Sequence, residues 1–386
     1  MSWPEAKLSD VAEIDRKSIA PSDISTGTLY VGLEHITKGG GFIDVLSVSN
    51  GELASNKFLF DEQHILFGKL GPYLSKIARP SFTGICSTDI LPIRPKEELD
   101  RTYLYYWLRT PKMVGLATTR SSGAILPRLS PKELASFPVP LPPLSEQKRI
   151  AAILDQADAL RETRRAAIAK LDELLQSVFL DMLGDPVTNP KGWKICSIRE
   201  FAEVRIGPFG SLLHKHDYVD DGIPLINPSH IVGGEIAPDQ SFTVPEEKAE
   251  SLRNYRLQMG DIVLGRRGEI GRCAVVRESH HGFLCGTGSM FIRPEEGVDA
   301  DYIQKTISSP SVSFRLESKA KGITMKNLNS SIVEEFDLPL PDIETQLQFS
   351  SVKHKIESEK AVHEKMFNSL EFLFSSLQQL AFRGDL

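Results

Sequence analysis

Cysteine is scarce in this chain, and long apolar runs are missing. Its 386 residues include four cysteines, Cys86, Cys196, Cys273 and Cys285, which are too few and too scattered for a disulfide framework. No apolar run approaches the roughly 18 to 20 residues that span a bilayer. The N-terminal segment MSWPEAKLSD lacks the basic-then-apolar layout of a signal peptide. We therefore expect a cytoplasmic protein.

An excess of basic residues and a nucleotide-binding P-loop are also missing. The formal net charge is -6, which excludes a chain that is basic throughout but leaves room for a local basic face. No G-x-x-x-x-G-K-[ST] motif occurs, so we do not expect this chain to hydrolyse nucleotides.

Three short segments suggest chemistry, but each lacks residues that the chemistry needs. PLINPSH at 224–230 resembles an adenine-methyltransferase motif without its second proline and aromatic residue, and no glycine-rich cofactor loop accompanies it. PDQSFTVPEEK at 238–248 imitates a nuclease motif, but its carboxylates lie in a polar segment bounded by prolines. The cysteines and histidines of 273–285 have a spacing that fits no common zinc site. We expect no catalytic residue, bound cofactor or metal in this chain.

What the chain does contain is a duplication of its whole length. WPEAKLSDVAEI, from Trp3, matches WKICSIREFAEV, from Trp193, at an offset of 190. ILFGKLG, from Ile65, matches IVLGRRG, from Ile262, at an offset of 197. From Cys86 onward the offset stays at 199 for about ninety residues without a gap.

Each half has the same internal order. Short apolar runs broken by Gly, Pro, Asn and Asp predict a mixed domain, a proline-rich connector follows, and an apolar heptad pattern then predicts a long helix. We expect a mixed α/β (α+β) fold with head 1 at 1–143, a helix at 144–184, head 2 at 185–342 and a helix at 343–386. Gly184 and Gly384 lie where C-terminal glycines of helices occur.

Both helices are predicted to pair through a coiled-coil seam with alternating spacings of three and four residues. The predicted seam of the first helix is Ile150, Ile153, Ala157, Leu160, Arg164, Ala167, Leu171, Leu174 and Val178. That of the second is Phe349, Val352, Ile356, Glu359, His363, Met366, Leu370, Leu373, Leu377 and Leu380.

Connectivity favours antiparallel pairing of the two helices. Head 2 starts about eight residues after the first helix, a linker that reaches at most about 30 Å, and it leads directly into the second helix. A parallel pair would separate these helix ends by roughly 60 Å. The parallel arrangement stays open as an alternative, while the antiparallel one predicts an approximate two-fold axis within the chain.

Two similar heads with two-fold symmetry suit duplex DNA, whose backbones are also related by two-fold symmetry. Basic residues occur at matched places in both heads, next to glycines that allow close approach to phosphate. A solvated surface turn is the alternative for any single residue. The predicted DNA-binding residues are Lys69, Lys76, Arg120 and Arg128 in head 1, and Arg266, Arg267, Arg272, Lys319, Lys321, Lys326 and Asn327 in head 2.

Over essentially its full length the chain resembles the specificity subunits of type I restriction-modification enzymes. The resemblance rests on PLPPLSEQKRIAAILDQADAL with the long helix to LGDP, on IGPFGSLLHKHDYVDDGIPLI from Ile206, and on the closing LQQLAFRGDL. The second connector, LPLPDIETQLQ, is a weaker match, with Asp342 where the family favours proline and Thr345 in place of glutamate. Head 1 has no clear GPFGS equivalent.

The resemblance implies a non-catalytic subunit in which two target recognition domains each read one part of a split, asymmetric site in double-stranded DNA. It implies two methyltransferase subunits, which use S-adenosylmethionine and dock on the helices and connectors, and two restriction subunits, which use ATP and Mg²⁺. One alternative is a specificity subunit of another multi-subunit methylation or restriction system. A coiled-coil adaptor without DNA recognition is the other.

Overall fold

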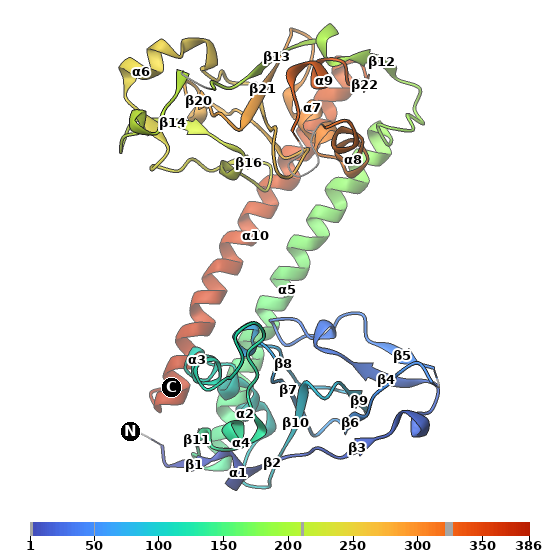
Figure 1. Ribbon diagram of the computed structural model, residues 1–386, viewed down its shortest axis with the longest axis vertical. Coiled ribbons are helices and arrows are strands. Elements are labelled where there is room, and N and C mark those ends of the chain that lie inside the picture. The colour runs from blue at the N-terminus through green and yellow to red at the C-terminus, as the bar shows by residue number, and fades with distance from the viewer. Residues whose placement is uncertain (1–2, 50, 210–211, 321–326) are drawn as a thin grey trace. The chain divides into compact units, whose positions relative to one another are not determined.

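The structure is a computed structural model that describes residues 3–49, 51–209, 212–320 and 327–386 (Figure 1). It divides into two compact units: unit 1 is residues 1–166 and 363–386, and unit 2 is residues 167–362. This division falls within both long helices and therefore does not test the predicted boundaries between heads and helices, which stay a prediction. Helices and mostly antiparallel sheets occur together in each unit, which confirms the mixed α+β class.

Head 1 combines short strands with short helices. Its strands are β1 (Glu5–Lys7), β2 (Ala12–Ile14), β3 (Ser18–Ile19), β4 (Thr28–Val31), β5 (Leu46–Val48), β6 (Lys57–Phe60), β7 (Ile65–Gly68), β8 (Ile77–Ala78), β9 (Gly84–Cys86), β10 (Ile90–Pro95) and β11 (Pro138–Pro140). Its helices are α1 (Leu8–Val11), α2 (Arg101–Leu108), α3 (Pro111–Thr119) and α4 (Pro131–Ala135), followed by the long α5 (Leu144–Leu183).

Head 2 repeats this order. Its strands are β12 (Lys194–Ser197), β13 (Ala202–Ile206), β14 (Ile223–Ile226), β15 (Ile231–Val232), β16 (Glu235–Ile236), β17 (Thr243–Val244), β18 (Ile262–Gly265), β19 (Cys273–Val275), β20 (Leu284–Cys285), β21 (Ser289–Pro294) and β22 (Asp337–Leu340). Its helices are α6 (Glu246–Ser251), α7 (Ala300–Ile307), α8 (Pro310–Lys319) and α9 (Ser330–Glu334), followed by the long α10 (Ile343–Arg383).

Two sheets have the same topology in both heads, whereas the remaining strands form one sheet in head 1, β3-β6-β9-β4-β5, and two in head 2, β17-β14-β20 and β15-β16. A four-stranded sheet has the order β2-β10-β7-β8 in head 1 and β13-β21-β18-β19 in head 2. The first strand of each head pairs with the last, β1 with β11 and β12 with β22. A parallel pair, β4 with β9 or β14 with β20, also recurs. The duplication seen in the sequence is therefore a duplication of the fold.

Side-chain hydrogen bonds are repeated between the heads as well. Asp100 caps α2 by accepting from the Tyr103 N–H at 2.9 Å, and its own N–H donates to the buried Gln147 side chain at 2.8 Å. The residues 199 positions later, Asp299, Tyr302 and Gln346, make the same bonds at 2.8 and 2.9 Å. Each buried glutamine also donates to a carbonyl of its proline-rich connector. The glutamine at the start of each long helix thus joins that helix to the connector and to the head.

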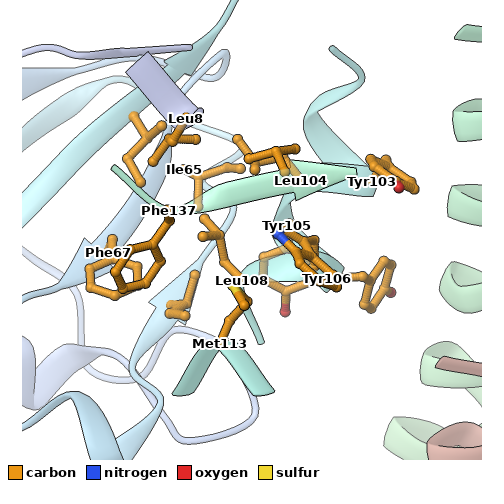
Figure 2. Packing of buried hydrophobic residues seen from close by; sticks show 14 of the residues in the cluster. Leu8, Ile65, Phe67, Tyr103, Leu104, Tyr105, Tyr106, Leu108, Met113 and Phe137 are labelled. Carbon is orange, nitrogen blue, oxygen red and sulfur yellow. The ribbon is translucent and has the colours of Figure 1, made fainter. Parts of the chain in front are cut away.

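The core of unit 1 lies between the sheet, α2 and the long helices. Figure 2 shows Leu104 of α2 beside Leu8 of α1 and Ile65 of β7, and Tyr103 and Tyr106 of α2 belong to the same buried cluster. Ile150 and Leu154 of α5, and Phe374 and Ala381 of α10, belong to the same buried cluster. The equivalent cluster of unit 2 includes Tyr302 of α7, Phe179 of α5 and Phe349 of α10.

The two long helices are antiparallel. In unit 1, Arg161 Nε donates to Glu371 Oε1 at 2.6 Å, and Arg164 Nη1 lies 3.1 Å from His363 Nδ1. In unit 2, Lys360 Nζ donates to Asp172 Oδ1 at 2.6 Å, and the rings of Phe179 and Phe349 lie 5.6 Å apart. Residue numbers rise along α5 as they fall along α10 in both units, which excludes the parallel alternative.

The predicted seam is wrong at several apolar positions. The side chains of five of them are between 41% and 56% exposed: Leu160, Leu174, Met366, Leu373 and Leu380. In unit 1 the buried row of α5 instead runs through Ile150, Leu154, Ala157 and Arg161. The heptad pattern assumed burial against the partner helix alone, whereas the same face of α5 also packs on the head.

Each head is attached to its long helix by ion pairs of opposite polarity. In unit 1, Arg79 of the head donates to Asp155 of α5 at 2.6 Å. In unit 2, the carboxylate belongs to the head: Asp301 accepts from Lys353 of α10 at 2.7 Å and lies 3.0 Å from His354 Nε2. Arg277 of head 2 completes this site with two bonds of 2.7 Å to Asp301.

The chain ends near its beginning in unit 1. Trp3 Nε1 donates to the carbonyl of Ala381 at 3.4 Å, and Arg149 Nη2 donates to the carbonyl of Leu386 at 2.7 Å. Gly184 and Gly384 end the helices with positive φ angles of 79° and 82°, as the sequence predicts. Of the helices among the described residues, none is long and apolar enough to cross a membrane.

Candidate nucleic-acid interface

The predicted basic residues lie on two segments of each head. One is the loop between β7 and β8 in head 1, or between β18 and β19 in head 2. The other follows α3 in head 1 and α8 in head 2. The sequence placed these segments at matched positions but contained no sign that they meet in space.

In head 1 the two segments are joined by backbone hydrogen bonds. The Leu129 N–H donates to the Lys69 carbonyl, and the Gly71 N–H donates to the Pro127 carbonyl, both at 2.9 Å. Leu70 and Arg128 form an antiparallel bridge. We call this contact the loop junction of head 1.

Head 2 has the same loop junction. The Leu328 N–H donates to the Arg266 carbonyl at 2.9 Å, and Arg267 forms an antiparallel bridge with Asn327. These residues correspond to Leu129, Lys69, Leu70 and Arg128 of head 1 at the repeat offsets of 199 and 197. Duplication has therefore preserved a place where two loops lie side by side and at least one of them contributes a basic residue.

The cations of the head 1 junction lie around one carboxylate. Lys69 Nζ is 3.8 Å and Arg128 Nε is 3.7 Å from the same oxygen of Asp89. The Arg128 side chain is 59% exposed and that of Lys69 is 22% exposed. At these distances Asp89 orients the two cations without binding them tightly, and Arg128 remains accessible.

In head 2 an amide replaces the carboxylate. Arg266 Nε donates to Asn327 Oδ1 at 3.2 Å. Burial, together with the neighbouring charge of Arg267, lowers the pKa of Arg266 below its usual value, although an arginine stays protonated at neutral pH. Arg267 is exposed. An Arg–Asn pair of this kind offers donors and an acceptor to phosphates and base edges.

Lys76 and Arg272 have matched partners inside their own heads. Lys76 Nζ donates to the Leu33 carbonyl at 2.6 Å, and Arg272 Nη1 donates to the Pro228 carbonyl at 3.2 Å. Leu33 and Pro228 begin equivalent 3-10 turns, Leu33–His35 and Pro228–His230. Both cations therefore tie the first loop to its head, and their predicted contact with DNA stays a prediction.

Arg120 and Lys319 also occupy equivalent places. Arg120 lies 5.8 Å from the ring centre of Phe137, and Lys319 lies 5.4 Å from that of Phe336. Arg120 also donates to Ser136 Oγ at 2.8 Å. These contacts hold the cations near the loop junctions. The remaining predicted residues, Lys321 and Lys326, lie outside the described residues.

The prediction from charge missed a group of exposed apolar residues at the head 1 junction. Ile125 is 91% and Leu126 is 58% exposed, and Tyr73 and Leu74 are 49% and 43% exposed. In the sequence these residues form two apolar pairs, each of which begins two residues after a glycine in a loop.

Residues of the segments that resemble catalytic motifs have partners in separate places. Glu246 forms an ion pair with Arg256, and Lys248 lies 3.2 Å from Asp217, so the nuclease-like residues are engaged separately. His230 of the methyltransferase-like segment is buried, with Nδ1 2.9 Å from the Leu225 carbonyl oxygen.

All four cysteines are free and buried, and burial raises the pKa of the Cys273 thiol to about 12. Within the part of the chain that the structure describes, no group of three or more His, Cys, Asp or Glu side chains could hold a metal ion.

Comparisons with known proteins agree on one family. Residues 2–172 and 190–371 match the family described as "Type I restriction modification DNA specificity domain". The chain is 31% identical over 185 residues to the type I restriction enzyme EcoDI specificity subunit of Escherichia coli, covering 46% of this chain and 40% of that protein. It is 21% identical over 421 residues to the EcoBI specificity subunit of Escherichia coli, covering 100% of this chain and 86% of that protein.

Solved structures show the same fold. The S subunit of a type I restriction-modification system from M. genitalium matches with a TM-score of 0.61 at 13% identity, covering 99% of this chain and 96% of that one. A chain from a structure described as "Structural basis underlying complex assembly and conformational transition of the type I R-M system" matches with a TM-score of 0.57 at 19% identity, covering 100% and 98%.

Proposed function

This chain belongs to the family of type I restriction modification DNA specificity domains, as a specificity subunit, and we propose that each of its heads reads one half of a split, asymmetric DNA site. The observation that carries this proposal is the loop junction, which recurs in both heads with an equivalent backbone bond, from Leu129 to Lys69 in head 1 and from Leu328 to Arg266 in head 2, and with an equivalent antiparallel bridge. A common backbone with different side chains suits two half-sites that differ in sequence.

Within this proposal the two junctions have a shared task and separate ones. Arg128 in head 1 and Arg267 in head 2 are exposed cations next to glycine-containing loops, so they supply phosphate contacts that position the head. Arg266 and Asn327, held together by their hydrogen bond, supply base-edge contacts in head 2. Lys76, Arg272, Arg120 and Lys319 act mainly by supporting the loops, because their side chains already have partners within the head.

The proposal includes partners that carry out the chemistry. Two methyltransferase subunits that use S-adenosylmethionine would dock on the long helices and connectors. Two restriction subunits that use ATP and Mg²⁺ would complete the assembly, while this chain contributes no catalytic group. Apolar side chains on both helices support a docking role because about half or more of their surface is exposed to solvent. They include Leu160, Phe372 and Leu373.

The test is to express this chain with its neighbouring methyltransferase subunit in a host that lacks adenine methylation, and to sequence the genomic DNA for modified bases. We expect one split motif, methylated on both strands and absent when this chain is omitted. A stable complex that leaves the genome unmodified, or that modifies one uninterrupted motif, would contradict the proposal.

The adaptor alternative makes a different prediction, and filter binding at low salt separates the two. An adaptor without DNA recognition leaves duplex DNA unbound at any salt concentration, whereas a specificity subunit binds it with strong salt dependence.

A further inference from the structure

The two loop junctions differ in the surface that their tips present. In head 2 the turn after the junction continues with Glu269, which is exposed and paired with Arg272, and Ile270, which is only 8% exposed. In head 1 the corresponding turn contains Tyr73 and Leu74, and both are exposed. This turn therefore presents an apolar pair in head 1 and an exposed charged residue in head 2.

The second loop of head 1 holds its apolar residues outward. Ser122 and Arg128 exchange two backbone hydrogen bonds, 3.0 and 2.8 Å long, that close the loop at its base. Gly123 has a φ of 114°, a conformation that L side chains rarely adopt. The chain then turns so that Ile125 is 91% and Leu126 58% exposed. The exposure of these side chains thus follows from a hydrogen-bonded loop.

The neighbouring turn adds a second apolar pair. Gly71, with a φ of 60°, starts the 3-10 turn Pro72–Leu74, and its N–H is bonded to the Pro127 carbonyl of the other loop. This bond brings Tyr73 and Leu74 next to the loop that carries Ile125 and Leu126. We call these four residues the apolar tip.

Charge decides which macromolecule the apolar tip fits. The cations Lys69 and Arg128 lie at its base, in the same loop junction. Duplex DNA matches this layout, because its phosphates are anionic and its bases are partly apolar. The phosphates would contact the cations, while base edges, thymine methyl groups or an opened base step would contact the apolar side chains.

We propose that Ile125 and Leu126 contact bases directly in the half-site read by head 1, with Tyr73 and Leu74 supporting them. Head 1 then reads its half-site through apolar contact and DNA deformability. This inference rests on the proposed function, since it presumes that head 1 binds DNA.

The test compares the unaltered full-length chain with the double variant Ile125→Ser/Leu126→Ser. The matched control is Leu46→Ser, which removes an exposed apolar side chain of β5 in the same head, outside both loops. The probe is a duplex carrying the motif found by methylation sequencing, and binding is measured over a range of salt concentrations. Thermal melting of each variant shows whether the fold is kept.

We expect the double variant to bind this duplex about tenfold more weakly, the scale of one lost base-pair contact. The slope of affinity against salt should not change, because no charge is removed. In cells the methylated motif should lose discrimination in one half while the other half is retained. The Leu46→Ser control should behave like the unaltered chain.

Three outcomes would overturn the inference. Unchanged affinity and an unchanged motif would show that the apolar tip does not touch bases. Normal DNA binding with weakened association of the methyltransferase subunit would make the tip a protein-docking surface. Absence of specific binding by the unaltered chain would refute the proposed function and, with it, this inference, whereas loss confined to the double variant leaves the proposed function intact.

Discussion

Head 1 holds its loop junction with Asp89 between Lys69 and Arg128, whereas head 2 holds the same junction with a hydrogen bond between Arg266 and Asn327. One backbone bond between the two loops, from Leu129 to Lys69 or from Leu328 to Arg266, recurs in both heads together with an antiparallel bridge. The comparison teaches that the position of the loops is set by main-chain hydrogen bonding, so the side chains on them are free to change. That separation suits a protein whose two heads must recognise different sequences.

The attachment of the heads to the long helices also combines hydrogen bonds that both heads share with side chains that differ between them. Both heads are bonded to a buried glutamine at the start of the long helix, Gln147 or Gln346, with matched bonds. They differ in polarity: α5 supplies the carboxylate of Asp155, whereas α10 supplies the cations Lys353 and His354. The unit 2 cluster is also more buried, since Asp301 and Lys353 are 6% and 4% exposed while Arg79 and Asp155 are 24% and 45% exposed.

We expect the largest effect from Asp301→Asn, which removes the buried carboxylate of the ion-pair cluster in unit 2. The change leaves Arg277 and Lys353 without their buried carboxylate, which should lower the free energy of unfolding by about 3 kcal/mol. The matched change in unit 1, Asp155→Asn, should cost about 1 kcal/mol or less because its ion pair is partly solvated. Chemical denaturation of both variants measures the difference, and equal losses would contradict it.

The same cluster predicts an acid dependence. Burial disfavours the charged form of Asp301, but hydrogen bonds and charge from Arg277 and Lys353 outweigh it and hold the pKa well below its usual value. A carboxyl with a lowered pKa stabilises the fold fully above its unfolded pKa of about 4 and loses that contribution as the pH falls further. Between pH 5 and roughly 3 the unaltered chain should lose more stability than Asp301→Asn; parallel curves would contradict this.

The next effect sharpens the contrast between the junctions. Arg266→Gln/Arg267→Gln should weaken binding of duplex DNA and reduce the slope of log affinity against log salt by about 1 to 2, because up to two phosphate contacts are lost. Arg199→Gln, which removes an exposed arginine of head 2 outside both loops, is the control and should leave the slope unchanged. A slope unaltered by the double change would remove both residues from the list of phosphate contacts.

The smallest effect concerns the matched supports of the first loop. Lys76→Met and Arg272→Met each remove a bond to a backbone carbonyl, and each should cost about 1 kcal/mol of stability without altering the salt slope. Denaturation and salt-dependent binding measured on the same preparations decide the matter. A clear drop in slope for either variant would return that residue to the DNA-contacting set.

Much of the fold could be predicted because repetition and periodicity are local properties of the sequence. The constant offset of 199 residues from Cys86 onward makes Gln147 equivalent to Gln346 and Tyr103 equivalent to Tyr302, and their hydrogen bonds match. The seam at Leu160 and Leu373 was wrong for a tertiary reason. Packing against a head rotates the buried face of a helix away from the heptad pattern that pairing alone predicts.

The candidate site was predicted in its regions more than in its residues. Charge drew attention to Arg266, Arg267 and Arg128, which do lie at the loop junctions, but also to Lys76 and Arg272, whose cations are bound to carbonyls of their own heads. Ile125 and Leu126 were missed because an apolar residue in a sequence is expected to be buried, and only solvent exposure distinguishes the exceptions.

The sequence alone determined that this chain is duplicated and that each half is a mixed domain followed by a long helix, and it favoured antiparallel helices. Those features depend on residue order, apolar period and linker length, all of which act along the chain. Only the tertiary structure decided that two loops more than fifty residues apart meet at Leu70 and Arg128, and again at Arg267 and Asn327. The reason is that such meetings depend on backbone hydrogen bonds, which any residue but proline can donate and which therefore leave no mark in the sequence.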